Sequence, residues 1–134
     1  MYFVGAFNSE IWMSAGNTNG YVSPVFQRFG SDGWTYFTDV THPELRGFHN
    51  ILAVEVDPRD PYQFFVASWG GGLLEYRNDE LVERYYNLNS PLETALPEQP
   101  NEPFTRVGGM SFDSEGNLWI TNAESAHNLH KLSP

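Results

Sequence analysis

The chain has 134 residues, enough for one small domain with a workable core. Seven basic residues face seventeen acidic ones, a formal charge of −10, which argues against nucleic acid or an anionic lipid surface as a direct partner because both require clustered Lys and Arg. The absence of cysteine excludes disulfides, thiolate metal sites and cysteine nucleophiles.

Four short strands are expected in a first unit, residues 1–38. Residues 2–6 and 11–16 read as strands, and Asn19-Gly20 is a hairpin signal because both residue types tolerate positive φ. A strand over 21–29 is interrupted by Pro24, which removes a ladder donor and favours an edge or a bulge. Residues 34–38 form the last strand of the unit.

A second unit follows at residues 51–86, after a connection at 39–50 that is rich in turn formers. The run 51–56 is apolar on both faces apart from Glu55, as expected of a strand buried on both sides. Asp57 then opens a turn with two prolines. Aromatic and β-branched runs predict further strands at 63–69, 73–77 and 81–86.

Four prolines mark residues 87–106 as a long surface loop, longer than ordinary connections and therefore a candidate for binding. The stretch 107–121, VGGMSFDSEGNLWIT, then predicts a strand, a tight turn from Asp113 to Asn117, and a second strand carrying Trp119. The unit at 107–134 holds only two or three strands and is incomplete.

The three units repeat at nearly equal intervals. Runs that begin at Ile11, Phe65 and Leu118 align, with spacings of 54 and 53 residues, and each interval encloses about four short strands. This period predicts an all-β chain of four-stranded antiparallel β-propeller blades, two blades plus part of a third. A sandwich remains an alternative, although it does not require the spacing. Because two and a half blades cannot close a ring, we expect a fragment, or a chain whose ends are covered by partners.

Residues 109–121 resemble the two-component regulator propeller repeat, in which an apolar strand, Asp, a Gly-Asn turn and Leu-Trp-Ile follow one another. More narrowly, residues 56–58 with 65–73, 86–92 and 107–110 resemble the propeller proteins of the type IX secretion system. That resemblance implies a non-catalytic, exported protein at the cell surface or outer membrane of a Bacteroidetes-type envelope, without a cofactor. It further implies protein partners in secretion and surface attachment, and anionic lipopolysaccharide as a ligand.

Two other functions stay open. One is the periplasmic glycan-sensing propeller of a hybrid two-component regulator, and the other is a propeller enzyme that acts on polysaccharide. No run approaches the roughly 20 apolar residues of a membrane helix. Met1 is not followed by basic residues, so we expect the signal peptide to lie outside this segment.

Candidate binding residues are Trp69, Gly70 and Gly71, because an aromatic ring beside a glycine run at a blade edge could stack on a sugar. Core packing is the default for such a tryptophan, and for Trp12 and Trp119, which recur in register. No metal site is expected. Asp113 and Asp57 have the residue pattern of turns rather than of a calcium loop. His127 and His130 are three apart on an expected strand, where their side chains point to opposite faces, and His42 and His49 have only Glu44 nearby.

Overall fold

The structure is a computed structural model that describes residues 2–134. Within that range it contains short strands and one 3-10 turn. The elements are β1 (Tyr2–Phe7), β2 (Glu10–Ala15), β3 (Val25–Gly30), β4 (Gly33–Thr38), η1 (Pro43–Leu45), β5 (Ile51–Val56), β6 (Gln63–Gly70), β7 (Gly72–Arg77), β8 (Glu80–Tyr85), β9 (Thr105–Phe112), β10 (Leu118–Ala123) and β11 (Leu129–Leu132).

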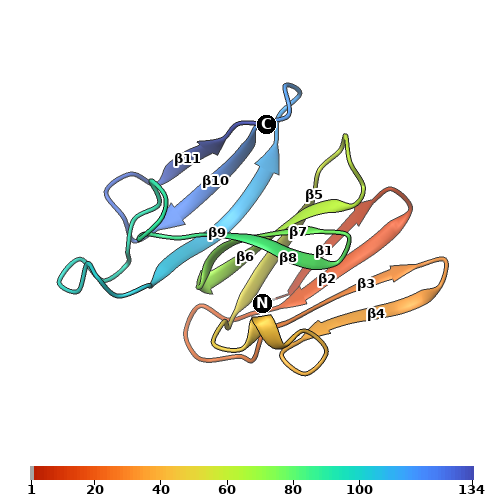
Figure 1. The fold of residues 1–134 in the computed structure, drawn as a ribbon, viewed down its shortest axis with the longest axis horizontal. Coiled ribbons are helices and arrows are strands. Elements are labelled where there is room, and N and C mark those ends of the chain that lie inside the picture. Colours follow the sequence, from red (N-terminus) through yellow and green to blue (C-terminus); the bar gives the residue numbers. More distant parts are fainter. Residues whose placement is uncertain (1) are drawn as a thin grey trace.

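These strands form three antiparallel meanders, which we call sheet 1 (β1–β4), sheet 2 (β5–β8) and sheet 3 (β9–β11). Figure 1 shows them side by side as a fan, with sheet 1 and sheet 3 at its two ends and sheet 2 between them. Sheet 2 and sheet 3 are also joined at one end, where Trp69 and Gly70 pair with Arg106 and Thr105. The predicted all-β propeller segment, with two four-stranded blades and part of a third, is confirmed.

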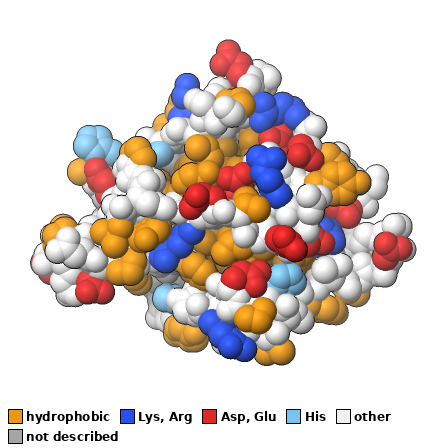
Figure 2. All heavy atoms as spheres, viewed as in Figure 1, with side chains coloured by type: hydrophobic (Ala, Val, Ile, Leu, Met, Phe, Trp, Pro, Cys, Tyr) orange, Lys and Arg blue, Asp and Glu red, His pale blue; other side chains and the backbone are white. Residues whose placement is uncertain are grey.

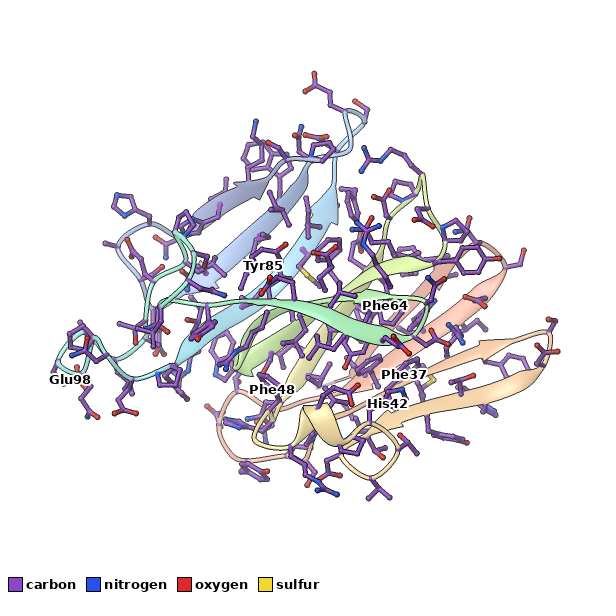
Figure 3. All side chains as sticks on the ribbon, in the orientation of Figure 1. Phe37, His42, Phe48, Phe64, Tyr85 and Glu98 are labelled. Carbon is purple, nitrogen blue, oxygen red and sulfur yellow. The ribbon has the colours of Figure 1, made fainter. Side chains whose placement is uncertain are left out.

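Aromatic rings hold sheet 1 against sheet 2. Trp12 on β2 and Phe37 on β4 lie 4.7 Å and 5.8 Å from Phe64 on β6, between ring centroids. Phe64 in turn stacks on Tyr76 at 5.0 Å with nearly parallel rings. All four side chains are fully buried or nearly so, and Figure 3 labels Phe37 and Phe64 where the two sheets meet. Such ring pairs stabilise an interface beyond the apolar area that they bury.

The interface between sheet 2 and sheet 3 is built mainly from aliphatic side chains. Phe65 on β6 faces Val107 and Leu118, and its ring lies 5.9 Å from that of Phe112. Leu92 from the long proline-rich loop adds a buried side chain to the same cluster. The first part of this loop is therefore anchored, whereas Figure 3 shows Glu98 at the tip of a projecting excursion.

The internal repeat is real, but our alignment of its second copy is wrong by one residue. Phe64 pairs with Val56 as Leu118 pairs with Phe112, and Phe64 and Leu118 both face the preceding sheet. The structural equivalent of Ile11 is thus Phe64, not Phe65. A slip of one position moves every side chain of a strand to the other face, so only the burial pattern fixes the register.

Asp113 has the turn role that the sequence predicts. Its carboxylate accepts hydrogen bonds from the backbone N–H groups of Glu115 and Asn117, and from the side chains of Asn117 and Trp119 at 2.8 Å each. Gly116 in this turn has φ +83°, a conformation that favours glycine. Asp57 closes its own turn in the same manner through the N–H of Arg59.

Asp113→Asn should make the free energy of unfolding less dependent on pH below about pH 4. The Asn117 side chain, followed by that of Trp119, lowers the pKa of Asp113 to about 2, below the unfolded value of about 3.9. Because the folded-state pKa is depressed, the stabilisation is complete above about pH 4 and is lost as the pH falls towards 2. Urea titrations at pH 7, 4 and 2.5 measure this, with Asp32→Asn on the β3–β4 turn as the control. Curves for Asp113→Asn and the parent chain that run parallel between pH 4 and 2.5 would contradict it.

The predicted hairpin at Asn19-Gly20 and the strand over 21–29 are wrong in part. Strand β3 begins only at Val25, after Pro24, and residues 16–24 form a loop. The carboxamide of Asn50, far along the chain, sets the shape of this loop through hydrogen bonds. A long-range side chain thus overrides the local hairpin signal.

Side chains of both charges are interspersed with hydrophobic ones on the face shown in Figure 2, without a large patch of a single sign. Among the described residues, no helix is long and apolar enough to cross a membrane.

Candidate functional site

A pocket of about 350 Å³ lies near the beginnings of β5 and β9, the first strands of sheet 2 and sheet 3. We call it the entry pocket. Four segments that are far apart in sequence line it, namely residues 18–21, residues 49–50, Trp69, and Phe104 with Arg106. The β6–β9 pairing sets Trp69 directly opposite Arg106, so the two side chains are fixed by backbone hydrogen bonding across neighbouring sheets.

Arg106 is held between two aromatic rings. Its guanidinium carbon lies 5.2 Å from the centre of the Trp69 ring and 5.1 Å from that of Phe104. One terminal nitrogen pairs with the carboxylate of Glu124. The Nε of Arg106 and the Nε1 of Trp69 are buried and have no hydrogen-bond partner among the described residues. The pocket wall therefore combines aromatic ring faces with a cation.

The opposite wall is the loop before β3, and Asn50 holds it in place. The Asn50 carboxamide oxygen accepts the N–H groups of Val22 at 2.9 Å and Asn17 at 3.3 Å, and its nitrogen donates to the carbonyl of Gly20 at 2.6 Å. These bonds present Tyr21, an exposed side chain whose ring lies 5.0 Å from that of His49.

The glycine run has a structural task behind the pocket. Gly70 has φ +143°, and a Cβ there would lie 3.0 Å from both His49 and Phe104, so a larger residue would push these rings. Gly71 donates its N–H to the Ser68 hydroxyl at 2.9 Å and leaves no room for a side chain against Phe48. Of the three candidate binding residues, the structure places Trp69 on the pocket wall, Gly70 behind it and Gly71 in the packed turn.

Tyr21, His49, Phe104 and Arg106 belong to one site that the sequence alone does not reveal. They come from three different loops and one strand start, and no local motif links them. Tyrosine and tryptophan rings bind sugar faces, while guanidinium binds phosphate or carboxylate groups with charge-assisted hydrogen bonds. The arrangement is suited to a saccharide that carries an anionic group.

A second pocket of about 340 Å³ lies between sheet 2 and sheet 3 and contains acidic residues. Its Glu75 carboxylate accepts hydrogen bonds from Gln63 at 2.8 Å, Arg77 at 3.2 Å and the Tyr85 hydroxyl at 2.8 Å. Burial, followed by the bond to Glu75, raises the pKa of Tyr85 to about 12. These groups satisfy one another, which is the pattern of a structural network.

The histidines considered as metal ligands contact other groups of the chain. His127 lies in the turn before β11, not on a strand, and its Nδ1 is 2.5 Å from the Glu93 carboxylate. That contact, together with the backbone N–H groups of His127 and Ala126, lowers the pKa of Glu93. His130 instead contacts the carbonyl of His127. Among the described residues, no group of three or more His, Asp or Glu side chains is placed to hold a metal ion.

No protein-family model matched the sequence, and no curated protein matched it either. Among solved structures, the chain is similar to PorZ of Porphyromonas gingivalis, described as an essential bacterial surface component of the type IX secretion system, with a TM-score of 0.86 and 25% sequence identity. The alignment covers 98% of this chain and 18% of the PorZ chain, so this chain spans under a fifth of that protein. The similarity confirms the predicted relationship to the propeller proteins of this secretion system.

Proposed function

We propose that this PorZ-like propeller segment belongs to a non-catalytic surface component of a type IX secretion system, and that it binds anionic lipopolysaccharide through the entry pocket. In this proposal the protein is exported and associated with the outer membrane, and it works beside protein partners that attach exported proteins to the surface. The similarity to PorZ, a surface component of a type IX secretion system, supports the proposed location and the proposed link to secretion.

The observation that supports an anionic ligand is the environment of the Arg106 side chain. A chain with a formal charge of −10 repels anions in general, so an anionic ligand needs a local cation on a shaped surface. Arg106 lies between Trp69 and Phe104, at the mouth of a pocket that Tyr21 flanks. Its partner Glu124 is more than half exposed and can be displaced by a stronger anion. Ring faces and guanidinium together match the two halves of a phosphorylated sugar.

Arg106→Gln should weaken binding of a phosphorylated lipopolysaccharide about tenfold to a hundredfold, because hydrogen bonds to charged groups contribute about 1.5–3 kcal/mol. Calorimetry or surface plasmon resonance on the immobilised 134-residue chain measures the dissociation constant. The same lipopolysaccharide after removal of its phosphates is the matched ligand, and it should bind the parent chain and the variant alike.

Arg46→Gln, on the exposed connection after η1, is the matched protein control and should bind as the parent does. Tyr21→Ala should weaken the phosphorylated and the dephosphorylated ligand equally, because it removes a ring face and no charge. Equal affinity of the parent and Arg106→Gln for the phosphorylated ligand would refute the role of the entry pocket.

A further inference from the structure

An anion of the chain itself already engages Arg106. The Glu124 carboxylate pairs with the terminal nitrogen Nη1 of Arg106, and this is the sole hydrogen bond of the Glu124 side chain among the described residues. A guanidinium binds an anion most strongly through two parallel N–H bonds. The Nε of Arg106 is buried, which leaves the two terminal nitrogens for a ligand. An anion that takes both of them therefore has to displace the Glu124 carboxylate.

The backbone keeps Glu124 beside Arg106 whether or not the two side chains are paired. Ala123, its neighbour in the chain, is the cross-strand partner of Arg106 in the β9–β10 ladder. The buried side chain of Asn122 donates to the carbonyl of Arg106 at 3.3 Å and bonds to both backbone groups of Glu93. The Glu93 carboxylate in turn accepts two backbone N–H groups of the turn that follows Glu124. A displaced Glu124 carboxylate therefore stays close, as an intramolecular competitor at high effective concentration.

Because the competitor is a carboxylate, it sets what a ligand must offer. A uronic acid exchanges one carboxylate for another at Arg106, so its charge adds nothing to its affinity. It also approaches a chain whose formal charge of −10 repels it. A phosphate monoester carries a charge of about −1.5 to −2 at pH 7 and has three acceptor oxygens. It can therefore engage both terminal nitrogens of Arg106 and displace Glu124.

We propose that Glu124 occupies the anion site of Arg106 as an internal competitor, so that the entry pocket takes saccharides with a phosphate monoester and gains nothing from sugar carboxylates. This inference rests on the proposed binding of an anionic saccharide at the entry pocket, and it identifies the anionic group. The Trp69 and Phe104 rings contact the guanidinium independently of Glu124. Arg106 therefore stays in place when the Glu124 charge is removed or displaced.

Three sugars that differ at one carbon atom test this competition. Glucose 6-phosphate, glucuronate and glucose share a hexose ring and carry a phosphate, a carboxylate and a hydroxyl group at C6. NMR titration of the 134-residue chain gives each dissociation constant from the indole N–H signal of Trp69, whose ring contacts Arg106. The parent should bind glucose 6-phosphate about tenfold more tightly than glucose, and glucuronate no more tightly than glucose. Arg106→Gln should bind all three sugars alike.

Glu124→Gln should turn glucuronate into a ligand of Arg106. Glutamine has the same shape and meets the same backbone conformation, φ +56°, but it has no charge with which to compete. Glucuronate should then bind about threefold to tenfold more tightly than it binds the parent, glucose 6-phosphate should also gain, and glucose should be unchanged. Glu98→Gln is the matched control, because it removes the same formal charge from an exposed side chain at the tip of the proline-rich loop. It should leave all three affinities as in the parent.

The same titrations separate failure of this inference from failure of the proposed function. A parent chain that binds glucuronate as tightly as Glu124→Gln does overturns the inference and leaves Arg106 as an anion site. Weaker binding of glucose 6-phosphate by Glu124→Gln overturns it as well, because Glu124 then positions Arg106 instead of competing with the ligand. If neither anion binds the parent or Glu124→Gln more tightly than glucose does, Arg106 is not an anion site, and the proposed function fails together with the inference.

Discussion

Phe64→Ala should lower the free energy of unfolding by about 3–5 kcal/mol, the usual cost of removing a buried aromatic ring. Phe64 is 1% exposed, and its ring contacts rings from both sides of the first interface, Trp12 and Phe37 of sheet 1 and Tyr76 of sheet 2. Removing it leaves a cavity that relaxed neighbours fill only in part. Small domains are stable by about 5–15 kcal/mol, so the substitution takes a large share of the total. Urea denaturation followed by tryptophan fluorescence measures the change.

Tyr62→Ala is the matched control, because Tyr62 lies in the turn before the same strand and is largely exposed. We expect its effect to stay within about 0.5 kcal/mol, as for most surface substitutions. If Phe64→Ala and Tyr62→Ala cost the same, the aromatic cluster does not hold sheet 1 to sheet 2.

The fold was predictable because its signals are local. The Asp113 turn is specified by residues within five positions of one another, and the hairpin at Asn78-Asp79 by two adjacent residues, which have φ +49° and +65°. Short runs of apolar, β-branched and aromatic residues between turn formers then mark strands such as β5 and β6 without any knowledge of their neighbours. Such rules act over a few residues, which a sequence displays directly.

The candidate site was predictable only at Trp69, where a local aromatic and glycine pattern occurs. Phe104 and Arg106 follow a long proline-rich loop, and Tyr21 precedes them by more than eighty residues. Their meeting depends on how sheets stack, and the β6–β9 pairing that aligns Trp69 with Arg106 leaves no mark in either segment. The one-residue error in the repeat has the same cause, because Phe64 and Phe65 are identical in type and differ only in the sheet that each one faces.

Asn50 is the residue through which stability and the candidate site are coupled. Asn50 is buried, with 3% of its surface exposed. Its backbone has φ +52°, a conformation that Asn and Gly adopt far more readily than Ala. It is also the sole described side chain that bonds to Asn17, Gly20 and Val22 together. The loop wall of the entry pocket therefore depends mainly on the Asn50 carboxamide, which acts beside one backbone hydrogen bond from the Asn50 N–H to the carbonyl of Val22 at 2.9 Å.

Asn50→Ala should destabilise the chain by about 2–3 kcal/mol and release the loop at residues 17–22. The substitution leaves the N–H of Val22 and the carbonyl of Gly20 without side-chain partners, and it adds strain at positive φ. Asn50→Gly removes the same hydrogen bonds without the strain, so it should recover roughly 1 kcal/mol of the loss while the loop stays released. Urea denaturation separates the two variants, and hydrogen exchange should show faster exchange at Val22 in both.

Because the loop carries Tyr21, both variants should also bind phosphorylated lipopolysaccharide more weakly than the parent does. Unchanged exchange at Val22 in Asn50→Gly would mean that the backbone of the loop, and not the Asn50 carboxamide, shapes the wall of the pocket.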